Sequence, residues 1–570
     1  MKYSSLWIVL QRMRLPFTVI VISYVIAMIG FLIIPGVDDA GKEYFLTIFD
    51  AFYFVTYTAT TIGFGETPYT FTHDQRIWAS ISIYLTVISW FYGIGSLVSL
   101  LQDKLFLSEI AMARFQNSVN NIKEDFVILL GYNDTTSEIT KKLLDSNMRV
   151  VVVEIDQARA NYLMLEGFTP HVPVLVKDAH NAEALELAGI KSIHCRGIVS
   201  LFETNILNLR VTLASKILNP HVKVVVRSST DNDTGNLLDA GADIVENPFN
   251  IIAYQLQMAL YGSSLFKLKN WLYKIDALDG KSFSIPSENI IICGYGRLGE
   301  TLYKMFIKNN ISPTVIEHNR VIFNRAKKDG VEKLINGNAE DKFTLKEAKI
   351  DEAKLIFVGT NNDTTNLSIV STVKKLNKDT VIIARENELS DFSIFSHAKI
   401  DHIFLPSKIL IHKTVNALIN PLSDTLIRMI ARKDEQWGSE LLSNLIKNIG
   451  VDPVTFELNI NKNEAEQIYN HIKQNNTLKL FELRRSRRDR NQHNNIIPLL
   501  IIRKDKEILL PSFDEAIELE DKILFACDDN GKEDLEYISN NMYEFHYIIH
   551  GEENRYFTNI IKNKFKGDKK

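Results

Sequence analysis

The chain has 570 residues, of which 46% are hydrophobic, and a formal net charge of −4. At about 100–200 residues per domain, this length predicts three or four domains and excludes a single activity spread over the whole chain. Its three cysteines, Cys195, Cys293 and Cys527, are far apart, and its thirteen histidines show no metal-ligand spacing. The sequence therefore predicts neither a disulfide framework nor a zinc site. The average composition hides an asymmetry, because the first hundred residues are far more apolar than the rest.

Two long apolar segments lie in this first part of the chain. Residues 15–34 carry no charged side chain and supply the ~20 residues that cross a bilayer core, and residues 77–101 do the same. The first segment is longer than the ~7–15 residues of a signal-peptide core and has no small-residue cleavage site. Both segments are predicted to span a membrane. The alternative is two buried helices of a soluble core.

Charges flank the two segments asymmetrically. Basic residues precede the first segment and follow the second, whereas the connection between them is acidic. The basic residues are Lys2, Arg12, Arg14, Lys104 and Arg114, and the acidic ones are Asp38, Asp39, Glu43, Asp50, Glu66 and Asp74. Because basic residues stay on the cytoplasmic side, we expect a multi-pass protein of the cell membrane with both termini in the cytoplasm.

The connection contains a short apolar segment, 47–59, which is too short to span a membrane and reads as a pore helix. Residues 58–66 follow with the sequence TATTIGFGE. This stretch resembles the potassium-channel signature TxTTVGYGD, with Ile, Phe and Glu in place of Val, Tyr and Asp. The resemblance implies a selectivity filter over 60–66, formed by Thr61, Ile62, Gly63, Phe64, Gly65 and Glu66.

The chemistry of potassium explains these residue types. Stacked rings of backbone carbonyls replace the water around the ion, so four chains are needed and the protein is expected to be a homotetramer that conducts K+. Gly63 and Gly65 permit the positive φ angles that turn successive carbonyls to one axis. The C-terminus of the 47–59 helix adds a partial negative charge. Phe64 removes a supporting hydrogen bond but no ligand. Other membrane proteins with a re-entrant loop are the alternative.

Glycines interrupt the second span near its cytoplasmic end. Gly93 and Gly95 are followed by Leu97 and Leu101, which suggests a hinge and a gate. Close helix packing explains such glycines equally well, so both interpretations stay open.

From residue 126 onward, strand-like and helical stretches alternate, which predicts βαβ units around parallel sheets. The unit occurs twice. The number of residues from Gly131 to Gly294 is the same as from Glu154 to Glu317, which indicates a duplication.

The second copy carries a dinucleotide fingerprint in its proper context. Gly294, Gly296 and Gly299 follow a strand at 290–293 and open a helix, so a pyrophosphate would lie at the helix N-terminus. Glu317 ends the next strand, where an acidic residue bonds the ribose and disfavours a 2′-phosphate. NAD or ADP is therefore the expected ligand.

The first copy departs from this fingerprint. Gly131 is kept, but Asn133 and Thr136 replace the second and third glycines, while Glu154 remains in the ribose position. Asn133 would hinder the approach of a pyrophosphate. A Rossmann scaffold without ligand is the favoured interpretation here, and a weaker nucleotide site is the alternative.

The two copies resemble RCK domains, also called KTN or TrkA-N domains. The resemblance spans most of 126–405 and rests on KDA at 177–179, NA at 338–339, ETN at 203–205, TNL at 365–367, and the strand-ending Arg227 and Arg385. Residues 496–528 are similar to the small C-terminal lobe of such domains. The resemblance implies a cytosolic ring that gates potassium flux, as in prokaryotic two-span channels with tandem RCK domains, and leaves Ca2+ open as a further ligand. It places Gly294, Gly296, Arg297, Gly299, Glu317, Asn338, Ala339 and Thr360 in the nucleotide pocket.

The whole sequence predicts a multidomain protein: a two-helix α-helical pore domain, two α/β Rossmann-like domains and a small α+β lobe. The predicted divisions are a pore domain at 1–105, a linker at 106–125, the copies at 126–285 and 286–445, and a lobe and tail at 446–570. The predicted function is a ligand-gated potassium channel, not an enzyme. A membrane-tethered NAD-dependent dehydrogenase and a regulatory subunit of a potassium transporter are the alternatives. The arginine-rich stretch 484–490 has no interleaved aromatic residues, so no nucleic-acid partner is predicted.

Overall fold

The computed structural model describes residues 13–261, 263–280, 285–387, 392–504 and 506–552. The chain divides into two compact units, Met1–Asn121 and Ile122–Lys570. Lys2 and Arg12, on which the predicted orientation partly rests, lie outside the described residues.

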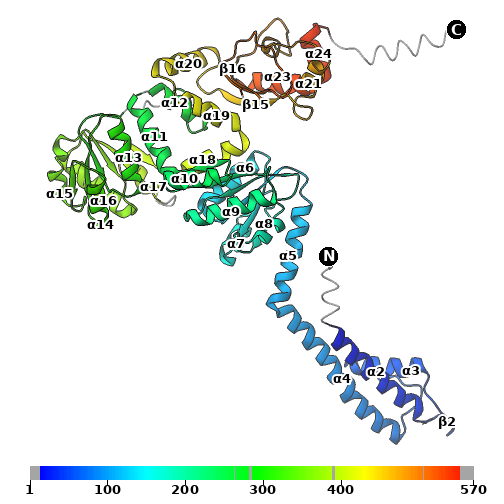
Figure 1. Ribbon diagram of the computed structural model, residues 1–570. Coiled ribbons are helices and arrows are strands. Elements are labelled where there is room, and N and C mark those ends of the chain that lie inside the picture. The colour runs from blue at the N-terminus through cyan, green and yellow to red at the C-terminus, as the bar shows by residue number, and fades with distance from the viewer. Residues whose placement is uncertain (1–12, 262, 281–284, 388–391, 505, 553–570) are drawn as a thin grey trace, which may run out of the picture. The chain divides into compact units, whose positions relative to one another are not determined.

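The first unit is built on two long apolar helices (Figure 1). Helix α2 (Arg14–Ile33) and helix α4 (His73–Gln102) are long and apolar enough to cross a membrane. Between them lie strands β1 (Gly36–Val37) and β2 (Glu43–Tyr44) and the short helix α3 (Ile48–Ala59), and helix α5 (Lys104–Asn120) follows α4. The segment predicted as a linker is thus largely helical.

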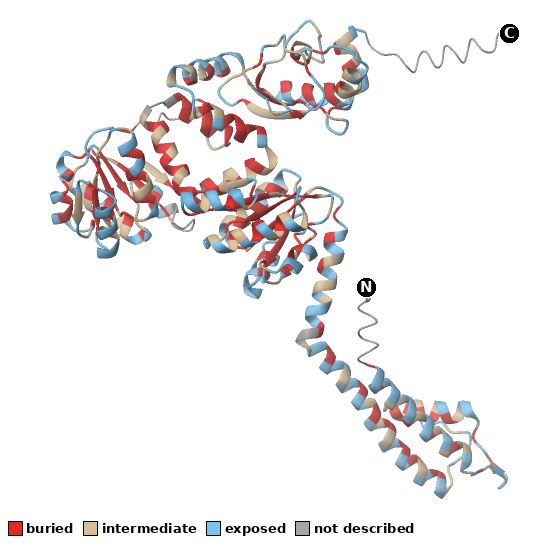
Figure 2. Ribbon diagram, in the orientation of Figure 1, coloured by how far each residue is buried: buried red, intermediate tan, exposed pale blue. Residues whose placement is uncertain are grey.

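Local signals fix where these helices begin and how they pack. Thr47 and Asp50 form a capping box at the start of α3, and Thr72 and Gln75 form another at the start of α4. The indole of Trp78 donates a hydrogen bond to the carbonyl of Ala27 at 2.9 Å, which ties α4 to α2. Much of the outer face of both helices is apolar and exposed (Figure 2), as expected of a surface that meets lipid or a neighbouring copy.

The second unit contains two six-stranded parallel sheets with the same strand order. The first sheet has the order β5-β4-β3-β6-β7-β8 and the second β11-β10-β9-β12-β13-β14. This is the doubly wound dinucleotide-binding topology, so the predicted pair of α/β Rossmann-like folds is confirmed. The strands of both sheets are buried in the core (Figure 2), which is why they read as runs of Val, Ile and Leu.

The bounds of these elements follow. In the first copy they are β3 (Phe126–Leu130), α6 (Asp134–Asp145), β4 (Arg149–Glu154), α7 (Gln157–Leu165), β5 (Val174–Val176), α8 (Ala182–Leu187), β6 (Cys195–Ser200), α9 (Asn205–Leu218), β7 (Lys223–Arg227), α10 (Asp231–Asp239) and β8 (Ile244–Glu246). In the second copy they are β9 (Ile290–Cys293), α13 (Arg297–Lys308), β10 (Thr314–Glu317), α14 (Arg320–Lys328), β11 (Leu334–Asn336), α15 (Lys342–Glu347), η1 (Ile350–Glu352), β12 (Leu355–Val358), α16 (Asp363–Leu376), β13 (Val381–Arg385), α17 (Phe392–His397) and β14 (His402–Phe404).

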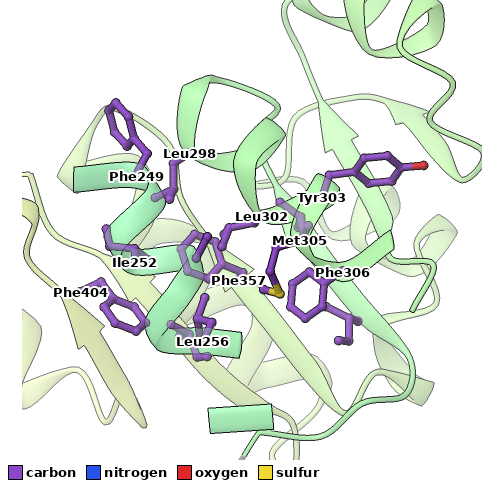
Figure 3. Close-up of a cluster of buried hydrophobic side chains, with 14 of the residues drawn as sticks. Phe249, Ile252, Leu256, Leu298, Leu302, Tyr303, Met305, Phe306, Phe357 and Phe404 are labelled. Carbon is purple, nitrogen blue, oxygen red and sulfur yellow. The ribbon is translucent and has the colours of Figure 1, made fainter. Parts of the chain in front are cut away.

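The helix that follows each copy packs into the core of the other copy. Helix α11 (Pro248–Tyr261) follows the last strand of the first copy, yet it packs on α13 of the second copy. Its Phe249, Ile252 and Leu256 share a buried cluster with Leu298 and Phe306 (Figure 3). Conversely, helix α18 (Pro406–Ile419) follows the last strand of the second copy and packs on α6 of the first, where Ile411 joins that copy's core.

A smaller lobe completes the unit. Helices α12 (Ser263–Leu272), α19 (Pro421–Ile430) and α20 (Glu435–Asn448) pack beside a four-stranded antiparallel sheet of order β15-β18-β16-β17. The remaining elements are β15 (Val454–Asn459), α21 (Glu466–Lys473), α22 (Leu480–Leu483), β16 (Ile496–Arg503), β17 (Lys506–Leu509), β18 (Lys522–Cys527), α23 (Asp529–Asn540) and α24 (Met542–His550). The predicted α+β lobe is confirmed.

The packing of α13 on β9 gives a test of the fold. A Cβ on Gly299 would lie 1.9 Å from the carbonyl oxygen of Gly294, whereas a Cβ on Gly296 meets nothing within 4 Å. Gly299→Ala should therefore lower the free energy of unfolding by about 1–3 kcal/mol through overpacking. Gly296→Ala is the matched control and should leave the thermal midpoint of the purified full chain nearly unchanged. Equal midpoints for the two variants would contradict this packing.

Candidate functional site

The loop after α3 has an alternating backbone. Thr61, Gly63 and Gly65 have φ angles of 61°, 65° and 72°, and each is separated from the next by one residue outside the left-handed region. The amides of Ile62 and Gly63 both donate to the carbonyl of Tyr57, at 2.9 and 3.1 Å, which anchors the loop to the end of α3. A backbone that alternates in this way can present successive carbonyls to one side, as ion ligation by stacked rings requires.

Two tyrosines of α3 hold the far end of this loop. The hydroxyl of Tyr57 donates to the carbonyl of Glu66 at 3.0 Å, and that of Tyr53 donates to the Glu66 carboxylate at 3.1 Å. The ring of Tyr57 also meets Phe64 edge-on, with centroids 6.4 Å apart. Sequence reasoning missed these supports, although tyrosines one helical turn apart on α3 were a readable signal. They supply hydrogen bonds behind the loop where Phe64 supplies none.

The glycines of the second span differ in their surroundings. Helix α4 runs without interruption through both of them. A Cβ on Gly93 would lie 2.6 Å from the Cδ1 of Ile20 on α2, whereas a Cβ on Gly95 would meet nothing within 4 Å. Gly93 therefore serves close helix packing, and a hinge at Gly95 stays a prediction. Leu97 and Leu101, the predicted gate, are 42% and 58% exposed in the single chain.

In the second copy, the glycine turn is open at the N-terminus of α13. Gly294 has a φ angle of 94°, and Gly296 occupies the N-cap position, where it has no side chain to accept from the first amides of the helix. Such an N-terminus favours a phosphate. Thr360 lies beside Gly294, since a Cβ added there would be 3.9 Å from its Cα.

Glu317 is buried beneath this turn. Its carboxylate accepts hydrogen bonds from the amides of Tyr295 and Asn319, both at 2.7 Å, and it is 3% exposed. It ties the turn to the end of β10, so its predicted contact with a ribose stays a prediction. Ala339 is also buried, and the side-chain oxygen of Asn338 accepts from the amide of Glu340 at 3.0 Å.

The corresponding turn of the first copy caps its own helix. Gly131 has a φ angle of 81°. The side-chain oxygen of Asn133 accepts from the amide of Thr136 at 3.0 Å, and the Thr136 hydroxyl accepts from the amide of Asn133 at 2.8 Å. Glu154 accepts from the amides of Tyr132 and Asp156 at 2.5 and 2.8 Å. The helix end that a pyrophosphate would use is thus already occupied by a side chain.

A cavity of about 700 Å³ lies between the carboxyl ends of the two sheets. The first copy supplies the 131–136 turn and the end of β7, and the second copy supplies the start of α13, the end of β13 and the start of α18. Four arginines line it, and Glu203 is the one acid among its described lining residues. The arginines are Arg159, Arg227, Arg297 and Arg385.

The arginines of this cavity are incompletely paired. The guanidinium of Arg297 donates to the hydroxyl of Ser229 at 3.1 Å, and Arg227 lies 3.4 Å from Glu203. The Nε atoms of Arg227 and Arg385 are buried and have no hydrogen-bond partner among the described residues. Burial, followed by the nearby charge of Arg297, lowers the pKa of Arg385 to about 10. The cavity therefore favours an anion with several acceptor oxygens.

Arg297 also lines the cavity between the copies. Its predicted place in the nucleotide pocket of the second copy stays a prediction. Arg227 and Arg385 were recognised as strand-ending residues but not as lining residues. Their equivalent places at the carboxyl ends of β7 and β13 were the available signal, because ligands bind at that edge of a parallel sheet.

Two family models match the chain. The ion channel model matches residues 9–103, and the TrkA-N domain model matches twice, at 127–248 and 290–406. The chain therefore joins an ion-channel segment of a membrane protein to two TrkA-N, or RCK, domains. This confirms the predicted combination of a channel segment with tandem RCK domains.

The chain is similar to two kinds of curated protein. The chain is 23% identical over 240 residues to potassium channel protein 1 of Methanocaldococcus jannaschii, covering 42% of this chain and 67% of that protein. It is 31% identical over 119 residues to the Trk system potassium uptake protein TrkA homolog of Methanothermobacter thermautotrophicus, covering 21% and 55%. The chain spans between 35% and 67% of the length of three of the curated relatives that it matches.

Solved structures are also similar. The GsuK channel bound to NAD is 15% identical, with a TM-score of 0.47, and the match covers 93% of this chain and 98% of that chain. The GsuK bound to ADP is 18% identical, with a TM-score of 0.48, and the match covers 73% and 99%.

The tyrosine supports give a test of the loop at 60–66. Tyr57→Phe removes the hydrogen bond to the Glu66 carbonyl, worth about 0.5–1.5 kcal/mol, and should loosen the carbonyl arrangement. The extra thermal stability of the purified chain in K+ over Na+ should then shrink. Tyr53→Phe is the matched control, because its partner is an exposed carboxylate, and it should have the smaller effect. A larger effect from Tyr53→Phe would contradict the assigned supports.

Proposed function

We propose that this chain is one subunit of a homotetrameric potassium channel of the cell membrane, opened or closed by a ligand at its tandem RCK domains. The observation that carries the proposal is the alternating backbone at Thr61, Gly63 and Gly65, held between two helices that are long enough to span a membrane. One chain supplies one set of carbonyls, so four chains around an axis are needed to enclose an ion.

The same proposal fixes the arrangement in the membrane. Both termini are cytoplasmic, because Arg14, Lys104 and Arg114 flank the two spans on the outside whereas acidic residues outnumber basic ones in the connection between the spans. Lipid or a neighbouring copy covers the exposed apolar faces of α2 and α4. The division into a pore domain at 1–105, two RCK units at 126–285 and 286–445, and a lobe and tail at 446–570 is part of this proposal.

The competing functions leave parts of the chain unexplained. A tethered dehydrogenase would need a proton donor beside a nicotinamide, whereas the cavity between the copies is lined mainly by arginines, amides and apolar side chains. A regulatory subunit of a separate transporter would have no use for the loop at 60–66. We therefore propose a channel that is not an enzyme.

The proposed ligand is an adenine nucleotide, NAD or ADP. The open three-glycine turn at Gly294, Gly296 and Gly299 supports a pyrophosphate at the second copy. The arginines that line the cavity favour an anionic ligand beside the first copy. This is stronger support for such a ligand than the incomplete fingerprint in the sequence. Because both copies line this cavity, a ligand there would favour one relative arrangement of the two, which is what gating requires.

Calcium is left out of the proposal. The described residues contain no group of three or more His, Cys, Asp or Glu side chains that could hold a metal ion. The relatives and solved structures reported above name potassium, NAD and ADP.

Ion selectivity is the first test of this function. Currents from the purified chain in lipid should reverse near the potassium equilibrium potential, because the ligands are backbone carbonyls spaced for K+. Gly63→Ala should abolish conduction, since a Cβ strains the backbone at φ 65°, while the cytosolic unit stays folded. Comparable permeability to Na+ and K+ would rule out the proposed filter.

Nucleotide binding is the second test. Gly296→Val should weaken the binding of ADP or NAD, measured by calorimetry, at least about tenfold, because it blocks pyrophosphate approach. Asn133→Val should matter less, since that turn already departs from the fingerprint. Open probability should change in parallel, with a coupling on the order of 1–3 kcal/mol.

The same titration distinguishes the glycine turn of the second copy from the arginine-lined cavity as the binding site. Arg385→Met removes a guanidinium from the cavity, and Arg196→Met is its control, because Arg196 is 61% exposed and paired with Asp125 at the start of β6. Loss of binding in Arg385→Met with normal binding in Gly296→Val would place the nucleotide in the arginine-lined cavity between the copies and not on the glycine turn of the second copy. Normal responses in both variants would show that the domains answer to another ligand.

A further inference from the structure

A second cavity, of about 600 Å³, lies away from both glycine turns. It is bounded by the end of β8 and by helices α11, α12, α18 and α19, with Tyr273 just beyond α12. These helices are the ones that connect the two copies to each other and to the C-terminal lobe. Nothing in the predicted nucleotide site or the filter accounts for it.

A buried lysine faces this cavity without a partner. Lys269 of α12 is 1% exposed, and its Nζ atom has no hydrogen-bond partner among the described residues. The amine lies 4.6 Å from the centre of the Tyr254 ring, a cation–π contact that partly compensates its burial. The hydroxyl of Tyr254, which also lines the cavity, is likewise buried and has no hydrogen-bond partner among the described residues.

The acids that line the cavity are committed to other cations. Glu246 pairs with Lys413 at 3.1 Å, Asp424 pairs with Arg428 at 3.4 Å, and Asp243 pairs with Lys216 at 2.8 Å. None of these pairs includes Lys269. A buried ammonium without a partner is costly, typically several kcal/mol, and proteins rarely keep one without a use.

Electrostatics agrees with this geometry. Burial, and then the charge of Lys413, lower the pKa of Lys269 well below its ordinary value, whereas the charges of Glu246 and Asp424 raise it. A further negative charge brought into the cavity would favour the protonated form of this amine.

The chemistry of the unpartnered groups defines the class of ligand. The ammonium of Lys269 and the phenol hydroxyl of Tyr254 can both donate hydrogen bonds, so the ligand must bring acceptor oxygens and a negative charge. Ile251 and Ile427, which also line the cavity, offer an apolar surface for a carbon body. A volume of about 600 Å³ is within the range of small-molecule sites.

We infer that the cavity around Lys269 is a second ligand site, which binds a small organic carboxylate with its carboxylate on Lys269 and Tyr254. The site is separate from the proposed nucleotide site and from the pore. Since α11 and α12 follow the first sheet and α18 and α19 follow the second, an occupant contacts elements from both copies. It would therefore act on the same arrangement that nucleotide is proposed to control.

Calorimetry on the purified full chain in detergent tests the inference, with benzoate as the probe. Benzoate should bind the unmodified chain, and Lys269→Met should weaken that binding at least about tenfold, as loss of a charged hydrogen bond predicts. Lys267→Met, a neutralisation on the same helix outside the cavity, is the matched control and should bind benzoate normally. Inorganic phosphate at equal concentration should bind more weakly than benzoate.

Folding of the variants is checked in the same samples. Methionine keeps the length of the lysine stem without its charge, so the thermal midpoint of Lys269→Met should equal or exceed that of the unmodified chain. Tyr254→Phe keeps the ring and loses the hydroxyl, and it should also weaken benzoate binding, which tests the site if Lys269→Met fails to fold. Absent benzoate binding, binding that neither variant weakens, or tighter binding of phosphate would each overturn the inference.

Discussion

The exchange of α11 and α18 between the two copies is the constraint on which the second unit, Ile122–Lys570, depends. Phe249 and Leu256 of α11 are buried in the core of the second copy, and Ile411 of α18 is buried in the core of the first. Neither core is complete without the helix that the other lends, because each such side chain contributes about 1.5–3 kcal/mol of burial. The carboxyl ends of the two sheets consequently share one arginine-lined cavity.

The fold was largely predictable because its signals are local. Runs of buried strands, the turn at Gly294 and the repeated spacing of acidic strand ends specify a parallel sheet without knowledge of its partners. The backbone of the loop at 60–66 was equally readable, since Gly63 and Gly65 are glycines that adopt positive φ. Thr61 adopts the same backbone at φ 61° although its side chain is β-branched, so nothing in its residue type predicts that angle.

The composition of the sites was less predictable, because it depends on contacts distant in sequence. Arg297 looked like part of its own glycine turn, yet its guanidinium reaches Ser229 of the first copy. Lys269 is one of two lysines on α12. Only the packing of α11, α18 and α19 around it makes it a buried amine with no acid to pair with. Sequence periodicity reports which face of a helix is apolar, but not which elements cover it.

Both cavities contain buried basic side chains that lack full hydrogen-bond partners, and both lie at the junction of the copies. A ligand that binds only one arrangement of this junction stabilises it by about 2.7 kcal/mol at one hundred times its dissociation constant. That is comparable with a typical allosteric coupling of 1–3 kcal/mol. The cost of holding Arg385 and Lys269 without full partners is therefore a reason for the junction to respond to anions. Complete internal salt bridges at these positions would stabilise the unit without a ligand. The binding of a ligand would then add less free energy to one arrangement of the junction.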